Sequence, residues 1–326
     1  MIKEPTFKVL LTGATGFVGR FLCEHLLEQG RGVIAAGRRD NGVLLNEIKQ
    51  KNVGPFTAET DWTDVLQGTE VVIHTAARVH MMNDLSSDPL ETFRKVNAYA
   101  TLNLARQASK SGVKRFVFLS SIKVNGEMTR PGHFFSPEDT FITSDPYGLS
   151  KYEAEQGLLA LAKETGMEVV IIRPPLVYGP GVKANFKSMM KWVYKSVPLP
   201  FGAVHNQRSL VALDNLVDFI TLCADREKSP KAANQVFLIS DGEDVSTTEL
   251  LIKVAHAFDK KPFLITMPVG LMTFAAKLVG MGDMANRLFG SLQVDSSKAR
   301  ELLGWKPVIT MDEQLKKTAK EFLNDD

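Results

Sequence analysis

Cysteine, net charge and long hydrophobic runs are all scarce in this sequence of 326 residues. The two cysteines, Cys23 and Cys223, fall in apolar helical periods, which argues against a disulfide framework, and no cysteine–histidine cluster has the spacing of metal ligands. The formal net charge of +2 offers little electrostatic attraction for nucleic acid. We therefore expect neither a metal site nor a nucleic-acid partner.

The longest apolar stretch, residues 268–282, is interrupted by Lys277. It is shorter than the roughly 20 apolar residues that a transmembrane helix needs. The first residues, MIKEPTFKVLLTG, lead directly into a strand pattern and do not resemble a signal peptide. We expect a cytoplasmic protein without stable membrane insertion, in which this stretch is a helix packed on the protein's own core. An interfacial helix is the alternative.

Short β-branched runs alternate with segments of helical periodicity. The runs are almost continuously apolar, as expected for a parallel sheet whose two faces are both covered by helices. This pattern predicts an α/β fold: a Rossmann-type doubly wound parallel sheet in residues 1–178, then a smaller C-terminal substrate-binding lobe in residues 179–326 that returns a strand or helix to the sheet. The expected strands are 8–12, 33–36, 71–75, 116–120, 169–173 and 236–240, and the expected helices are 17–29, 90–111 and 150–165.

A glycine-rich turn lies between the first predicted strand and the first predicted helix. Glycine at positions 13, 16 and 19 permits a tight turn, close approach of the backbone to a diphosphate, and close packing of helix on strand. The N-terminus of the helix adds N–H donors and a favourable dipole for the phosphates. The sequence therefore predicts a dinucleotide site formed by Gly13, Thr15, Gly16, Phe17, Val18 and Gly19.

The residues at the end of the second predicted strand bear on the choice of cofactor. A site selective for NAD places Asp or Glu there to bind the 2′-hydroxyl of the adenosine ribose, whereas this chain has Gly37-Arg38-Arg39. Arginine cannot accept a hydrogen bond from that hydroxyl, but its forked donors suit a 2′-phosphate. The pattern favours NADP(H), with NAD(H) as the alternative if Arg38 and Arg39 are only solvated in a surface loop.

Tyr147 and Lys151 are four residues apart in a segment predicted to begin a helix, with Asp145 as its N-cap and Pro146 in its first turn. The two side chains therefore share a helix face. A nearby ammonium group stabilises a phenolate, so Lys151 is expected to lower the pKa of Tyr147 below its reference value of about 10. The pair predicts a general acid that exchanges a proton with a carbonyl or alcohol.

Six motifs occur in an order that resembles one enzyme family. They are TGATGFVG (12–19), HTAA (74–77), LSSIKVNG (119–126), YGLSK (147–151), RPPLVYGPG (173–181) and RSLVALDNLVD (208–218). They resemble the extended short-chain dehydrogenases/reductases that act on nucleotide sugars, the NAD-dependent epimerase/dehydratase family. This resemblance covers nearly the whole chain. It implies a UDP-sugar substrate and a homodimer formed through the helices predicted at 90–111 and 150–165.

The resemblance also implies a catalytic role for three residues. Ser121 would hydrogen-bond the reacting oxygen and Tyr147 would exchange its proton. Lys151 would assist Tyr147 and bind the nicotinamide ribose. Ser120, which precedes Ser121, is then expected to be an ordinary strand-end residue.

The two residues after Ser121 separate branches of the family. In the 4,6-dehydratase branch the hydroxyl residue is followed by Asp-Glu, the acid and base that eliminate water. This chain has Ile122, which has no transferable proton, and Lys123. Dehydration is therefore not expected, and Lys123 either contacts the substrate or covers the loop.

The remaining binding residues are likewise implied by the resemblance. The cofactor side adds Ala76, Ala77 and Pro174, and the substrate side comprises Arg78, Ser121, Lys123, Asn185, Leu199, Arg208 and Arg287. Arg208 matches the arginine that binds the nucleotide diphosphate, whose planar charge a guanidinium fork suits. Asn185 and Leu199 lie where phosphate and uracil are held. Arg287 is either a second diphosphate ligand or a surface arginine on a helix.

Two reactions at C4 of the sugar are compatible with these residues. A 4-epimerase retains its oxidised cofactor, which an acidic residue on the ribose assists, whereas a 4-keto reductase releases NADP⁺ after each turnover. Arg38 therefore favours reduction of a UDP-4-keto-(amino)hexose over the alternative, a UDP-sugar 4-epimerase with retained NAD. A reductase of small ketones is less favoured because Arg208 and Asn185 suit a nucleotide sugar. A non-catalytic NADP-sensing protein is less favoured because Tyr147 and Lys151 are both present.

We expect the protein to bind NADPH at least about tenfold more tightly than NADH, because a charge-assisted contact to the 2′-phosphate contributes roughly 1.5–3 kcal/mol. Replacing both arginines (Arg38→Ala with Arg39→Ala) should remove the preference. Calorimetric titration of the wild type and the double variant with each nucleotide measures it. Equal affinities in the wild type would contradict it.

Overall fold

The computed structural model describes residues 7–38, 48–79, 88–139, 143–278, 280 and 282–325. Its largest element is a seven-stranded sheet in the order β3-β2-β1-β4-β5-β6-β9, and every neighbouring pair in it is parallel. The expected doubly wound α/β fold is therefore confirmed. The strands are β1 (Lys8–Thr12), β2 (Gly32–Gly37), β3 (Lys49–Asn52), β4 (Val71–His74), β5 (Arg115–Leu119), β6 (Glu168–Arg173) and β9 (Gln235–Leu238).

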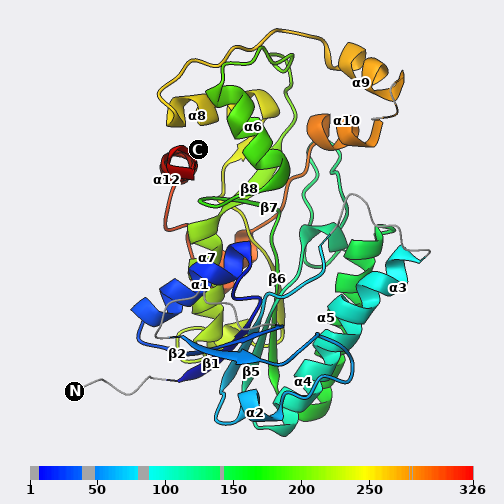
Figure 1. The fold of residues 1–326 in the computed structure, drawn as a ribbon. Coiled ribbons are helices and arrows are strands. Elements are labelled where there is room, and N and C mark those ends of the chain that lie inside the picture. The colour runs from blue at the N-terminus through cyan, green and yellow to red at the C-terminus, as the bar shows by residue number, and fades with distance from the viewer. Residues whose placement is uncertain are drawn as a thin grey trace.

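Helices cover both faces of this sheet (Figure 1). One face packs against α1 (Phe17–Glu28), α7 (Leu213–Ala224) and α11 (Ser297–Leu303), and the other against α2 (Thr63–Leu66), α4 (Ala100–Lys110) and α5 (Pro146–Thr165). Successive strand residues point to opposite faces, so Val9 and Leu11 enter the first core while Leu10 enters the second. Cys23 and Cys223 are free and buried in the first core.

The structure departs from the expected elements of this half most clearly in one helix and one strand. The single helix expected at 90–111 consists of α3 (Pro89–Arg94), a π-helical turn η1 (Lys95–Tyr99) and then α4. Strand β3 was not expected, because its sequence KQKN is polar and mostly exposed at the sheet edge. By contrast, the predicted start of α5 is confirmed, since Asp145 Oδ2 accepts a hydrogen bond from the Gly148 N–H at 2.8 Å.

The smaller lobe lies beyond the carboxyl ends of the large sheet (Figure 1). It contains a three-stranded sheet in the order β10-β8-β7 and a hydrophobic core of its own. The chain leaves the lobe through α7 and β9, which pack on and join the large sheet. The lobe elements are β7 (Leu176–Tyr178), α6 (Ala184–Tyr194), β8 (Arg208–Ala212), β10 (Asp244–Val245), α8 (Thr247–Ala257), α9 (Val269–Leu278), α10 (Gly282–Phe289) and α12 (Met311–Asp325).

Within the apolar stretch 268–282, residues Val269–Leu278 form α9, which is not a core helix. Met272 is buried, but Leu271, Phe274 and Leu278 are exposed by 57%, 60% and 73%. The expectation that this stretch packs on the protein's own core therefore holds for only one side of α9. Among the residues that the structure describes, no helix is long and apolar enough to cross a membrane.

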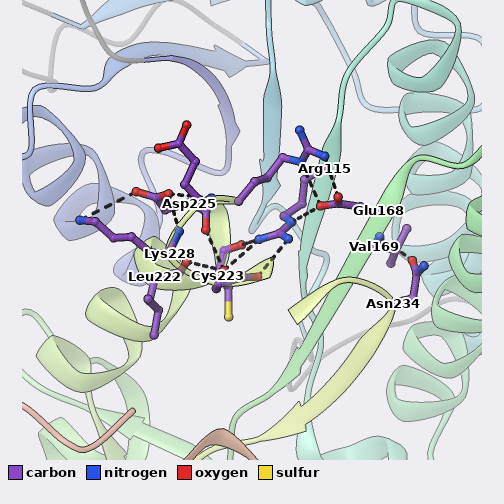
Figure 2. Close-up of polar contacts among 11 residues, drawn as sticks. Arg115, Glu168, Val169, Leu222, Cys223, Asp225, Lys228 and Asn234 are labelled. Atoms are coloured by element: carbon purple, nitrogen blue, oxygen red, sulfur yellow. Dashed lines mark hydrogen bonds and ion pairs between the residues drawn. The ribbon is translucent and has the colours of Figure 1, made fainter. Parts of the chain in front are cut away.

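A buried polar network lies at the amino-terminal ends of β5 and β6 (Figure 2). Arg115 on β5 is fully buried and donates to Glu168 on β6 at 2.7 Å. The same guanidinium donates to the carbonyl of Cys223 at 2.8 Å and to the hydroxyl of Ser229 at 2.9 Å. Arg226 also pairs with Glu168, but from the surface. Arg115 therefore joins two strands to the chain that follows α7.

We expect Arg115→Met to lower the free energy of unfolding by about 3–5 kcal/mol, because it leaves buried acceptors without a donor. The matched control is Arg226→Ala, which removes a side chain that is 45% exposed and pairs with the same Glu168. That change should cost about 0–1 kcal/mol. Urea unfolding of the three proteins measures both values, and equal losses would contradict the assignment of stability to the buried arginine.

Candidate active site

The glycine turn between β1 and α1 is closed by the loop that follows β4. Gly13 has φ +77°, and a Cβ there would lie 2.7 Å from the Ala76 nitrogen. A Cβ at Gly19 would lie 2.1 Å from the Gly13 carbonyl oxygen. Glycine is therefore required at both positions, first for the turn and then for close packing of α1 on it.

The N-terminus of α1 fits an anionic diphosphate. Its N-cap is Gly16, no side chain caps it, and its first turn holds no acidic residue. A cavity of about 260 Å³ borders this turn between α1, α6 and α12, and its lining includes three cations, Arg20, Lys183 and Lys187, and one carboxylate, Glu321. Backbone N–H groups, a helix dipole and nearby cations all favour phosphate, so the predicted dinucleotide residues from Gly13 to Gly19 suit the cofactor.

The loop after β4 is held against α5 by an asparagine. The Asn97 amide accepts from the Arg78 N–H at 2.8 Å and donates to the Arg78 carbonyl at 3.0 Å. It also donates to the hydroxyl of Ser150 at 3.1 Å. Asn97 lies on the π-helical turn η1. It therefore positions Ala76 and Ala77, the expected cofactor residues, relative to the helix that carries Tyr147.

The predicted catalytic residues lie together at the carboxyl end of β5. The Ser121 side chain lies beside the hydroxyl of Tyr147, and the Tyr147 ring packs edge-on against Phe93 at 5.8 Å between ring centroids. The ammonium of Lys151 is buried, donates to the Leu119 carbonyl at 2.8 Å and lies 4.1 Å from the centre of the Phe118 ring. The three residues expected to act together are thus neighbours.

The protonation of this group differs from the sequence expectation. Burial raises the pKa of Tyr147 to about 12, with the Ser121 hydrogen bond acting in the opposite direction. Burial also lowers the pKa of Lys151 to about 7, against the attraction of Glu155. The expected lowering of the Tyr147 pKa by Lys151 is therefore wrong for the protein alone, because desolvation of the phenolate is the larger effect.

His74, at the end of β4, is buried close to Lys151. Its ring nitrogens lie 2.7 Å from the hydroxyl of Thr12 and 2.9 Å from that of Thr101. Burial, together with the charge of Lys151, lowers the pKa of His74 to about 3. The ring is therefore neutral at physiological pH and links β1, β4 and α4 without adding a charge.

Glu155 and Arg173 form a buried ion pair behind the catalytic residues. Arg173 donates to both oxygens of Glu155, with its Nε 3.0 Å from Oε1. The Ser120 hydroxyl donates to Oε1 of Glu155 at 2.5 Å. Arg173 also donates to the Asn125 amide oxygen at 3.0 Å. Ser120 is thus a strand-end residue whose hydroxyl binds the ion pair. Glu155, one helical turn after Lys151, was missed by sequence reasoning, although this spacing could have indicated it.

The two residues after Ser121 are both held by the protein itself. Ile122 is buried and packs with Leu238, Leu292 and Val294. The ammonium of Lys123 lies 2.8 Å from Glu127 and 3.1 Å from Asp145, the N-cap of α5. Two roles were considered for Lys123, contact with the substrate and covering the loop. Its ion pairs with Glu127 and Asp145 agree with the second role.

The expected substrate residues of the lobe differ in their surroundings, and one of them is buried in the core of the lobe. Arg208 begins β8 and donates to the Gly290 carbonyl at 2.9 Å, just beyond α10, and burial lowers its pKa. Asn185 is exposed in the first turn of α6. Leu199 is buried in the core of the lobe, and its N–H and C=O bond to Phe263 and Ile265.

The remaining predicted residues are placed as follows. Pro174 is buried directly after β6, and its carbonyl accepts from the Ile122 N–H at 3.0 Å. Arg38 is exposed at the end of β2. Arg39 lies outside the described residues, and Arg287 lies in α10 with its side chain outside them.

A doubly wound sheet, a glycine turn at its first helix and a Ser–Tyr–Lys group at a neighbouring strand end define an enzyme of the short-chain dehydrogenase/reductase class. The sequence model of the NAD dependent epimerase/dehydratase family matches residues 9–239. The chain belongs to this family, as its motifs predicted.

Individual relatives agree with this assignment. A protein of Vibrio cholerae named UDP-glucose 4-epimerase is 50% identical over 321 residues, which cover 97% of this chain and 95% of the relative. The structure of UDP-glucose 4-epimerase with UDP-glucose from Thermotoga maritima has a TM-score of 0.74 at 24% identity, covering 98% and 99% of the two chains. UDP-glucuronic acid 4-epimerase from Bacillus cereus in complex with NAD has a TM-score of 0.76 at 20% identity, with 98% and 99% covered. These structures show the same fold.

We expect Tyr147→Phe to reduce turnover by about 10²–10⁴-fold, the usual contribution of a general acid–base group. Cofactor binding should change little, because only the hydroxyl is removed. Tyr152→Phe, on the same helix, is the matched control and should keep wild-type turnover. Steady-state rates and cofactor titrations of both variants test this, and a Tyr147→Phe rate within a few-fold of wild type would exclude Tyr147 as the proton-exchanging group.

Proposed function

We propose that this protein is a UDP-sugar 4-epimerase, which interconverts UDP-hexoses or their N-acetyl forms that differ in configuration at C4. The observation that carries the proposal is the 50% identity, over 97% of the chain, to the Vibrio cholerae relative named UDP-glucose 4-epimerase. The neighbouring Ser121, Tyr147 and Lys151 supply the groups that proton exchange at O4 requires.

Each residue of the site would have a separate role in the reaction. When bound, the oxidised nicotinamide cofactor supplies a two-electron acceptor for C4 and a positive charge that favours the Tyr147 phenolate. Tyr147 takes the proton of the O4 hydroxyl and later returns it, while Ser121 orients that oxygen. Lys151 holds its ammonium beside the strand end. Glu155 stabilises the charged form of Lys151 against its burial.

Reduction of a UDP-4-keto sugar, the reaction favoured by Arg38 in the sequence, becomes the second candidate. The residue at the end of β2 bears on the 2′ position of the cofactor, not on whether the cofactor leaves after each turnover. The high identity to a named epimerase therefore outweighs it. Preference for NADPH is a separate property, and the exposed position of Arg38 at the end of β2 leaves it accessible to a 2′-phosphate.

Substrate and subunit contacts complete the proposal. Arg208 would bind the diphosphate of the UDP-sugar from the lobe, close to Gly290. A homodimer would form through α3, α4 and α5, which lie together on one side of the sheet (Figure 1).

We expect protein purified without added cofactor to contain about one nicotinamide nucleotide per chain, and to interconvert UDP-GlcNAc and UDP-GalNAc, or UDP-glucose and UDP-galactose, without further cofactor. A retained cofactor is the physical requirement of a cycle that oxidises and re-reduces the same carbon. Nucleotide extraction and product chromatography test this, with Tyr147→Phe as the control that should retain nucleotide and lose conversion. An empty site, with NADPH oxidised only when a UDP-4-keto sugar is supplied, would instead identify the reductase.

A further inference from the structure

Exposed hydrophobic side chains are concentrated at the outer end of the lobe. Fourteen large hydrophobic residues are exposed in the part of the chain that the structure describes, and seven of them lie between Trp192 and Leu278. Single exposed apolar residues are normal on a protein surface, whereas a group of them marks an interaction site. The seven are Trp192, Val197, Phe263, Ile265, Leu271, Phe274 and Leu278, and we call them the apolar end.

Helix α9 contributes an apolar stripe to this end. Leu271, Phe274 and Leu278 are spaced by three and four residues and therefore share one helix face. Met272 is the buried residue of the helix, which packs against α10. Figure 1 shows α9 at the outer edge of the molecule, beyond α10, at the end of the chain that crosses the lobe from α8. The stripe thus has no partner among the described residues.

The other four residues of the apolar end lie on segments that are joined to one another. The Leu199 N–H bonds to the Phe263 carbonyl at 2.9 Å, and the Ile265 N–H bonds to the Leu199 carbonyl at 2.8 Å. The Val197 N–H bonds to the Trp192 carbonyl at 3.0 Å. The ring of Phe201, in the same loop, lies 6.1 Å from that of Phe289 in α10. The loop, the crossing chain and the α9–α10 pair are therefore adjacent to one another.

The charges on these segments are mostly positive. Residues 188–204 contain Lys191 and Lys195, whereas Lys183 and Lys187 line the cavity beside α1. Residues 258–289 contain three lysines and one arginine against two aspartates, Asp259 and Asp283. The chain as a whole has a net charge of only +2, so this end is much more basic than the remainder. Lys191, Lys195, Lys261 and Lys277 are exposed beside the apolar residues. An anionic surface would be attracted here.

We propose that the apolar end docks on an anionic lipid bilayer, with Leu271, Phe274 and Leu278 entering the interface and the lysines contacting lipid headgroups. Tryptophan, phenylalanine and leucine beside lysine are the composition of helices that lie in a membrane interface. A second copy of the chain is disfavoured, because a two-fold contact through this surface would bring lysines against lysines. Docking is peripheral, in keeping with the absence of a membrane-spanning helix from the described residues.

The test is sedimentation of the purified full chain with vesicles. Wild type should bind vesicles of phosphatidylethanolamine and phosphatidylglycerol more strongly than vesicles of phosphatidylcholine alone. Leu271→Ser with Phe274→Ser should weaken partitioning by about tenfold or more, since two apolar side chains no longer leave water. Lys261→Gln with Lys277→Gln should weaken it by about fivefold for each charge at low salt, and this difference should shrink at high salt.

The matched control is Val308→Ser with Leu323→Ser, which removes two exposed apolar residues outside the apolar end and should leave vesicle binding unchanged. Thermal unfolding of each variant checks that the fold is retained. The proposal is overturned if wild type binds neither kind of vesicle, or if Leu271→Ser with Phe274→Ser binds as well as wild type. It is equally overturned if that variant only dissociates an oligomer in size-exclusion chromatography without losing vesicle binding, because the surface would then cover a second copy.

Discussion

The arrangement of the candidate active site depends on the ion pair between Glu155 and Arg173. Both charges are buried, so each needs the other and further hydrogen bonds to offset its loss of hydration. Ser120 and Asn125 provide those bonds from two other segments. One interaction thereby fixes the end of β5, the loop after it, helix α5 and the end of β6 relative to one another. Lys151, one turn before Glu155, keeps part of its basicity because that carboxylate is close.

A buried arginine lies at each end of the strands of the large sheet, and the two have different roles. At the amino edge Arg115 bonds to Glu168 and to backbone groups around Ser229, far from the glycine turn, and we assign it to stability. At the carboxyl edge Arg173 lies directly before the expected cofactor residue Pro174, and its ion pair supports chemistry. The lobe adds a third group of charges, the exposed lysines Lys191, Lys195, Lys261 and Lys277.

Local signals carried much of the prediction. Strand β1, the glycine turn and the Asp145 cap follow from backbone requirements that a few adjacent residues satisfy, and the structure has them as expected. Strand β3 could not be predicted, because a polar edge strand is specified by its neighbour β2 and not by its own pattern. Leu199 resembled a substrate residue but lies in the core of the lobe, because residues 263–265 pair with it from 64 or more positions along the chain.

The sequence by itself determined the family, the doubly wound sheet and the candidates Ser121, Tyr147 and Lys151, because these depend on residue types at short, regular intervals along the chain. Only the tertiary structure decided which charged groups are buried together, away from water. It placed Glu155 against Arg173, and it surrounded Tyr147 so that burial raises its pKa, opposite to the direction expected from Lys151 alone. It also joined the loop around Leu199 to residues 263–265, and both segments carry exposed lysines. Desolvation and surface charge depend on which distant segments meet, and no local pattern contains that information.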